Sequence, residues 1–295
     1  MLAHCAAHLV LGSRVIWLQP NRKGIAMRIT ILVDVNTIID QYYIGEPAVC
    51  YYIEDGVQRV LLDTGYSDVF MRNAKSLNID LNAVTDVAIS HGHNDHTGGL
   101  RYFAGTFSSQ TINLIAHPDA FQERSDNGLS IGCPVELSKL EECFNLKLTK
   151  KPYAISDHLL FLGEIPSFND FERTAPVGLI KENGISKDDF ILDDSALAYT
   201  GTQGLFIITG CSHSGICNII EYAKRVSGEQ RIAGVLGGFH IIDVSEQLTK
   251  TIDYFAANGI STLYPCHCVS FAAKAEIHKK IPIYEVGVGL RITVE

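Results

Sequence analysis

The residues best suited to chemistry lie in the segment 90–99, where three histidines and one aspartate fall within six positions. His91 and His93 follow an apolar run, and side chains of an extended chain alternate with a period of two, so both imidazoles point the same way and can bind one cation. Asp95 and His96 come where the chain turns toward a helix, so they can serve a second, neighbouring cation. Imidazole together with carboxylate suits zinc, iron or manganese. The segment therefore predicts a site for one or two metal ions.

Further histidines each follow a short apolar run of strand length, at a point where the strand is expected to stop. In an open α/β sheet, the carboxyl ends of the strands form the edge at which ligands bind. We therefore expect these imidazoles to converge with the segment 90–99. His213 and His267 are predicted metal ligands, whereas His240 is either a ligand or a substrate contact and general acid. His117 also follows a strand and is predicted to be a pocket or core residue.

Asp63 ends another apolar run, in Leu-Leu-Asp-Thr-Gly at 61–65. A carboxylate at that place can hold a ligand imidazole or accept hydrogen bonds from backbone N–H groups around the metal segment. The alternative interpretation is an ordinary aspartate in a turn. The first interpretation predicts that Asp63 orients the site without binding the metal.

Short apolar runs alternate with amphipathic stretches from residue 28 onward. Asp-Gly at 55–56 predicts a hairpin turn between two early strands, and later strands are separated by helices. This mixture predicts an α/β layered domain in which helices cover mixed sheets. The less regular stretch 118–190 is interpreted as an insertion or lid over the site. Strands are expected at 28–35, 47–53, 58–62, 84–90, 111–116, 158–162, 190–199, 204–209, 231–236, 260–264 and 282–287, and helices at 67–77, 97–103, 214–227, 245–257 and 269–280.

Composition is typical of a folded globular protein, with 46% hydrophobic and 19% charged residues among 295. The formal net charge of -9 disfavours a nucleic-acid partner, because a phosphate backbone binds basic surfaces. Eight scattered cysteines do not form a disulfide scaffold, and no run is long enough to span a membrane, so we expect a cytoplasmic protein without a membrane partner. Residues 1–26 are interpreted as a dispensable extension or an extra helix, and 27–295 as the folded domain. The oligomeric state is not predicted.

The motif His-x-His-x-Asp-His at 91–96 resembles the signature of the metallo-β-lactamase superfamily. Leu-Asp-Thr-Gly at 62–65 and the late His267 extend this resemblance over most of the chain from Met27 onward. It implies an α/β fold, an αββα sandwich of two mixed β-sheets flanked by helices. Within the superfamily, the sequence is similar to the dihydropterin-forming ribofuranosylaminobenzene phosphate synthases of methanopterin biosynthesis. The motifs that carry this similarity lie at 163–166, 193–197, 210–216, 237–240 and 265–268.

Two positions depart from the family pattern. Many members have an aspartate that bridges two metals after the strand corresponding to 204–209, and Cys211 stands there in this sequence. Asp193 or Asp194 could supply the bridge instead, or the site could hold one tight and one loose ion. Ser195 stands where the branch carries glutamine, which predicts altered substrate contacts.

Cys266 and Cys268 flank His267. In an extended chain the neighbours of an inward-facing residue point away from it, so both cysteines are predicted to be packing residues. The Cys-x-Cys spacing alone is too weak a signal for a zinc site.

The resemblance implies one or two divalent ions per chain, with zinc as the first expectation and manganese, iron or magnesium as alternatives. Asp95 and His240 are the candidate catalytic residues. The expected substrate is a small anionic molecule, phosphorylated or pterin-like, and the expected reaction is a hydrolysis or a group transfer. A di-iron redox protein and a phosphodiesterase or nuclease of the same fold are the alternatives. The implied ligand sets are His91, His93 and His213 for one ion and Asp95, His96 and His267 for the other.

Overall fold

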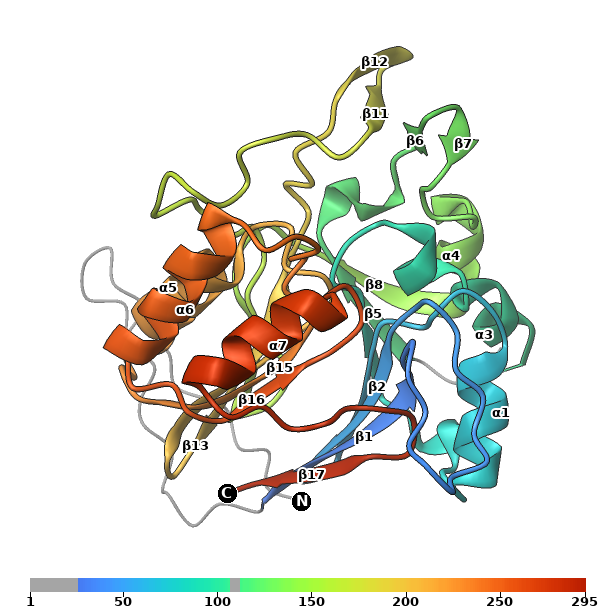
Figure 1. The fold of residues 1–295 in the computed structure, drawn as a ribbon. Coiled ribbons are helices and arrows are strands. Elements are labelled where there is room, and N and C mark those ends of the chain that lie inside the picture. The colour runs from blue at the N-terminus through green and yellow to red at the C-terminus, as the bar shows by residue number, and fades with distance from the viewer. Residues whose placement is uncertain (1–25, 107–111) are drawn as a thin grey trace, which may run out of the picture.

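The structure is a computed structural model that describes residues 26–106 and 112–295. The expected extension at 1–26 lies, apart from its last residue, outside the described part of the chain. Two large β-sheets face each other, and helices cover their outer faces (Figure 1). This is the αββα sandwich expected from the sequence. No helix in the described ranges is both long and apolar enough to cross a membrane.

The first sheet has seven strands in the order β17-β1-β2-β3-β4-β5-β8. The expected hairpin joins β2 to β3, with Asp55 paired to Gln58. The outer face of this seven-stranded sheet packs against helices through Phe70, Phe103 and Leu140, all of which are buried. The strands are β1 (Met27–Val33), β2 (Cys50–Asp55), β3 (Gln58–Leu62), β4 (Asp86–Ala88), β5 (Ile112–Ala116), β8 (Phe144–Leu148) and β17 (Arg291–Val294), and the helices are α1 (Val69–Ser76), α3 (Leu100–Thr106) and α4 (Leu137–Cys143).

The second sheet has six strands in the order β16-β15-β14-β13-β10-β9. Its helix α5 turns Ile216, Ile220 and Ala223 toward the sheet, as the helical spacing predicts. Gly228 ends that helix in the left-handed conformation. The strands are β9 (Tyr153–Ala154), β10 (Leu159–Phe161), β13 (Ala196–Gly201), β14 (Gly204–Thr209), β15 (Ile232–Gly237) and β16 (Leu263–Pro265), and the helices are α5 (Ile216–Ser227), α6 (Glu246–Ala257) and α7 (Phe271–Lys280).

The inner faces of the two sheets form a buried apolar layer between them. Ile29, Tyr51 and Leu62 from the first sheet meet Phe161 and Ile208 from the second, and each of these side chains is buried. Because successive residues of a strand point to opposite faces, the same strands also supply the two outer cores. The packed layer fixes both sheets relative to each other, so the loops at their shared edge have defined positions.

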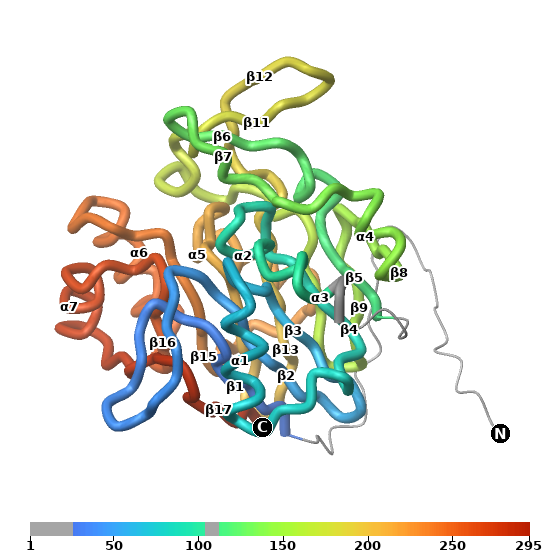
Figure 2. Tube along the Cα trace, turned by 90° about the vertical axis from the view of Figure 1, so that its right-hand side faces the viewer, coloured from blue at the N-terminus to red at the C-terminus, as the bar shows by residue number. Residues whose placement is uncertain are grey.

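A third, small sheet lies at one end of the sandwich (Figure 2). All its strands come from the stretch 118–190, which was expected to be an insertion. That expectation is only partly correct, because the same stretch also contains α4, β8, β9 and β10, which belong to the main layers. His93 pairs with Gly132 just beyond this sheet, so the small sheet contacts the metal segment. Its strands are β6 (Arg124–Asp126), β7 (Leu129–Ser130), β11 (Leu179–Glu182) and β12 (Ile185–Asp188).

The expected strand at 282–287 is wrong. Only an isolated bridge between Leu263 and Ile283 forms there, because Pro282 has no N–H to donate to a ladder. The closing strand is instead β17, which pairs antiparallel with β1. The helix expected at 97–103 is split into α2 (Asn94–Thr97) and α3. The remaining short helices are η1 (Leu81–Ala83) and η2 (Pro118–Phe121).

Candidate metal centre

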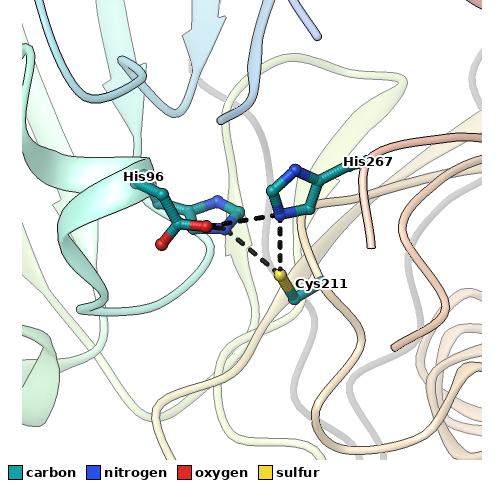
Figure 3. Close-up of side chains that lie close together, drawn as sticks. His96, Cys211 and His267 are labelled. Carbon is teal, nitrogen blue, oxygen red and sulfur yellow. Dashed lines mark hydrogen bonds and ion pairs between the residues drawn. The ribbon is translucent and has the colours of Figure 1, made fainter. Parts of the chain in front are cut away.

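Four side chains from three separate segments converge at the ends of the strands. Asp95 Oδ2 lies 3.3 Å from His96 Nε2 and 3.3 Å from His267 Nε2. Cys211 Sγ lies 3.2 Å from His96 Nε2 and 3.1 Å from His267 Nε2 (Figure 3). Ligands on a tetrahedral ion, with bonds of about 2.0–2.3 Å, lie about 3.3–3.8 Å apart. The observed separations of 3.1–3.3 Å lie at or just below the short end of that range, so small shifts of the side chains would make the four a ligand set for one divalent cation.

A second group of ligand atoms lies beside the first. The donor atoms of His91, Cys211 and His213 are within 4.8 Å of one another, and His91 Nε2 is 3.1 Å from His93 Nδ1. Burial lowers the pKa of His93 to about 3, and burial and neighbouring imidazoles lower the pKa of His91 and His213 well below the usual range. These rings are therefore neutral and keep a lone pair for a cation.

Unpaired buried nitrogens test whether this group fits a metal. His93 Nε2 and both ring nitrogens of His213 are buried without a hydrogen-bond partner. A buried polar atom without a partner costs about 1–3 kcal/mol. A cation in contact with these nitrogens removes that cost, so the residues present fit a metal ion.

Cys211 belongs to both groups, and its side chain is buried. Of the two alternative bridges, Asp193 accepts hydrogen bonds from Arg124 Nη2 at 2.6 Å and from Gly92 N at 2.7 Å. Asp194 Oδ2 accepts a hydrogen bond at 2.8 Å from Ser214 N, in the loop after β14. Neither aspartate belongs to a group of ligand atoms in the described part of the chain. Cys211 is therefore the residue whose donor atom would be available to both ligand groups.

Asp63 orients His96, as the sequence predicts. Its Oδ1 accepts a hydrogen bond from Ser90 N at 2.7 Å, and its Oδ2 accepts one from Ser90 Oγ at 2.7 Å. Oδ2 also lies 2.7 Å from His96 Nδ1. A carboxylate only accepts, so His96 donates from Nδ1, and its Nε2 is the atom that would bind a cation after losing its proton. Burial disfavours the charged ring, yet the carboxylates of Asp95 and Asp63 raise the pKa of His96 well above its usual value.

Four non-glycine residues after strand ends have left-handed backbone conformations, with φ of 60° at Asp63, 59° at Ser212, 48° at His240 and 50° at His267. Such conformations cost about 1–3 kcal/mol each and occur preferentially at functional sites. They turn side chains back toward the shared edge of the two sheets. The backbone conformation at this edge therefore reflects the position of the site as well as the ends of the strands.

The left-handed turn at His267 explains one wrong prediction. Cys266 packs as expected, with its Sγ 3.0 Å from Tyr51 Oη. Cys268 does not point away from the site, because the chain at His267 is not extended. The ligand atoms of Cys268, Cys211 and His240 lie within 4.8 Å of one another.

The remaining predicted histidines divide into two kinds. His240 reaches the site, with its ring centroid 4.2 Å from that of His213 and its Nδ1 buried without a partner. His117 was predicted to be a pocket or core residue, and it is a core residue. Its Nε2 lies 3.1 Å from Glu164 Oε2, and its Nδ1 accepts a hydrogen bond from Asp119 N at the start of η2.

A buried arginine was missed from the sequence. Arg124 donates from Nε to Asp189 Oδ2 at 2.7 Å and from Nη2 to Asp193 Oδ1 at 2.6 Å. Asp193 in turn holds the backbone N–H of Gly92, between two predicted ligands. A Cβ at Gly92 would lie 2.0 Å from the backbone oxygen of Ala120 and 2.2 Å from Arg124 Nη1, so glycine is required there. No local pattern marks this network, because its members are far apart in the sequence.

Comparisons with known proteins agree with this geometry. The sequence model of the metallo-β-lactamase superfamily matches residues 43–128. The uncharacterized protein MJ0448 of Methanocaldococcus jannaschii is 33% identical over 253 residues, which are 84% of this chain and 93% of that protein. A 7,8-dihydropterin-6-methyl-4-(beta-D-ribofuranosyl)-aminobenzene-5'-phosphate synthase of the same organism is 31% identical over 228 residues, which are 74% of this chain and 77% of the synthase.

A solved structure is similar over nearly the whole chain. The crystal structure of Tm1679, a metal-dependent hydrolase of the beta-lactamase superfamily, has a TM-score of 0.77 and 30% identity, covering 91% of this chain and 99% of that one. Yeast PDE1, at a TM-score of 0.56 and 12% identity over 92% of this chain and 99% of that one, shares the fold alone. The chain belongs to the metallo-β-lactamase superfamily.

Proposed function

We propose that the protein is a metal-dependent hydrolase or transferase that acts on a small anionic molecule. The observation that carries the proposal is that three groups of ligand atoms share Cys211 Sγ, and that two of these groups include residues of the motif at 91–96. Imidazole, carboxylate and thiolate together suit zinc, so zinc is the proposed metal. One group would consist of His91, His93, His213 and Cys211, and the other of Asp95, His96, His267 and Cys211.

The metal supplies one kind of chemistry: a bound divalent cation lowers the pKa of water from about 15.7 toward neutrality and stabilises developing negative charge. Asp95 supplies a carboxylate beside it. Burial opposes its ionisation, but His96 and His267 hold the pKa of Asp95 well below the usual value. Asp95 is therefore ionised at neutral pH and can orient an attacking water through a hydrogen bond.

His240 is the proposed general acid. Its ring lies against His213, and its Nδ1 has no hydrogen-bond partner. Burial lowers the pKa of His240, but Cys268 and the nearby Asp194 and Asp95 outweigh it and raise the pKa above the usual value. A protonated imidazole at this position can donate a proton to a leaving group or bind a substrate anion.

The choice between hydrolysis and group transfer rests on the relatives. Tm1679 is a metal-dependent hydrolase of the beta-lactamase superfamily, whereas the synthase of Methanocaldococcus jannaschii forms a dihydropterin compound that carries a 5'-phosphate. The identity of 30% to the first and 31% to the second supports both chemistries. We therefore propose a phosphorylated or pterin-like substrate for this site.

We also propose a cytoplasmic location. Seven cysteines in the described part of the chain have free thiols, Cys211 among them. A cysteine binds metal as the thiolate and must stay reduced, and thiols remain reduced in the cytosol.

Metal analysis and a substrate panel test the proposal. The protein is stripped with a chelator, reloaded with zinc, manganese, iron or magnesium, and assayed on phosphomonoesters, phosphodiesters, lactones, thioesters and pterin substrates. We expect one or two ions per chain, and less metal in His93→Ala and His267→Ala. His278→Ala, on the outer helix α7, is the control and should keep all its metal. Full metal content in both site variants would contradict the proposal.

A further inference from the structure

Arg173 lies beside the metal centre without a carboxylate partner. Its Nη2 donates a hydrogen bond to the hydroxyl of Ser214, the residue that follows His213. Its Nε is buried and has no hydrogen-bond partner. In the two described ranges, no carboxylate oxygen lies within 4.0 Å of its guanidinium, whereas Arg124 nearby has two such partners.

A positive charge in this position has a physical cost. Arginine does not lose its proton in proteins, and charged groups withdrawn from water are normally paired. Asp194, Glu164, Glu172 and Asp193 are near enough to attract the charge of Arg173, but none of them contacts its guanidinium directly. One oxygen of Asp194 instead accepts the N–H of Ser214. Its other oxygen, Oδ1, is buried without a partner. The guanidinium therefore has no direct carboxylate contact within the described residues, and its Nε can still donate a hydrogen bond to an anion.

The segment before Arg173 is fixed by its neighbour Glu172. The two oxygens of Glu172 accept the N–H groups of Cys217 and Asn218, each at 2.9 Å, at the start of α5. A Cβ at Gly215 would lie 2.2 Å from Glu172 Cδ, so the carboxylate fits closely over that turn. These contacts hold the segment without any contribution from the guanidinium.

The backbone of Arg173 itself is in an unfavourable conformation, with φ of 52°. A non-glycine residue keeps such a conformation only when the surrounding contacts impose it. The contacts of Glu172 impose it here, and the half-buried arginine side chain reaches Ser214. The segment is therefore built to place a guanidinium next to His213.

We propose that the guanidinium of Arg173, held in place by Ser214, binds the oxyanion of the substrate, a phosphate or a carboxylate, on the His213 side of the metal centre. The inference rests on the proposed function and specifies how its anionic substrate is recognised. The planar guanidinium forms paired hydrogen bonds with both kinds of oxyanion. Arg173 is thus a substrate-binding residue, separate from the metal ligands.

Two ligands that differ only in the oxyanion test the inference. Phenylphosphonate, which has no ester bond to hydrolyse, and benzoate are titrated by calorimetry into the metal-loaded wild-type protein, Arg173→Met and Arg173→Lys. We expect Arg173→Met to bind at least one of the two about tenfold or more weakly, because charge-assisted hydrogen bonds are lost. Arg173→Lys keeps the positive charge but loses the paired N–H donors of the guanidinium. Its affinity for each ligand should therefore lie between those of the wild type and Arg173→Met. The ligand with the larger loss identifies the oxyanion as phosphate or carboxylate.

The control is Arg225→Met. Arg225 is exposed on α5, in the same neighbourhood, and its guanidinium lies 3.9 Å from the ring centroid of Phe168. It should bind both ligands like the wild type. Metal content and thermal unfolding are measured for every variant and should be unchanged.

Three results would overturn the inference. Wild type and Arg173→Met could bind each ligand with the same affinity, or the wild type could bind neither ligand at millimolar concentration. Arg173→Met could also lose its metal or its fold, which would show a structural role instead. Failure of the proposed function looks different, because the purified wild-type protein would then bind no metal. Unchanged anion binding with intact metal content contradicts only the role of Arg173.

Discussion

The substitution Asp63→Asn changes which atoms carry hydrogen around His96 while keeping the shape of the side chain. Asp63 now accepts three hydrogen bonds at 2.7 Å, two from Ser90 and one from His96 Nδ1. An amide nitrogen at the position of Oδ2 would donate to His96 Nδ1 and move the ring proton to Nε2. That atom lies 3.2 Å from Cys211 Sγ in the ligand group, and once protonated it cannot bind a cation. If the amide turns over, its NH₂ group faces the N–H of Ser90 instead, and that hydrogen bond is lost.

The expected magnitude follows from this change. Groups that orient metal-binding histidines are worth about 10–100-fold in metal affinity, which is about 1.4–2.7 kcal/mol. Competition with a chromophoric chelator measures the affinity of each variant for zinc. Asp86→Asn is the matched control, because Asp86 is buried in β4 of the same sheet and accepts hydrogen bonds from Asn113 at 2.8 Å and Thr85 at 2.7 Å. It should lower thermal stability and leave zinc affinity unchanged.

The reasoning is refuted by one clear result. If Asp63→Asn binds zinc within about threefold of the wild-type affinity, below the range expected for such groups, then Asp63 does not set the protonation of His96. An equal loss of affinity in Asp63→Asn and Asp86→Asn would show a general loss of stability instead.

Three further predictions concern the bridge, the buried network and pH. In a cobalt-substituted protein, Cys211→Asp should keep both ions but lose the near-ultraviolet sulfur-to-cobalt absorption, and an unchanged spectrum would exclude Cys211 as a ligand. Arg124→Met should lower the free energy of unfolding in urea by about 3–5 kcal/mol, because buried Asp193 and Asp189 lose their partner; the exposed Arg231→Met should change it little, and equal effects would contradict the argument. Because the pKa of His96 is raised in the folded protein, protonation of this ring stabilises the metal-free fold fully at a pH below about 6.5, the pKa in the unfolded chain. This stabilisation is lost as the pH rises through the pKa of His96 in the folded protein. Zinc affinity should therefore increase with pH over that range, and chelator competition that shows no increase would count against His96 as a ligand.

Elements with strong local patterns could be predicted from the sequence. The strands at 58–62 and 204–209 have the predicted bounds, because each is a compact apolar run limited by turn residues. The role of Asp63 was also predictable, since it follows a strand directly and precedes Thr-Gly. The αββα fold followed from the resemblance of the motif at 91–96 to a known family.

Features that depend on contacts between distant parts of the chain could not be predicted. Arg124 and Asp193 are 69 positions apart, and nothing local in either segment indicates the ion pair. The left-handed conformation at His267 was not expected, because glycine or asparagine usually marks such turns, and so the position of Cys268 was missed. β17 was missed because its partner β1 lies at the other end of the described chain.

The sharing of Cys211 Sγ by the two ligand groups has a consequence for how the centre would fill. A thiolate that has already given electron density to one ion is a poorer donor to the next, so the two loading steps would have unequal equilibrium constants. The first ion would bind tightly and the second would exchange more readily with the surroundings. Conversion of this single sulfur to a sulfinic acid, which cells do not reverse in most proteins, would disturb both positions in one event.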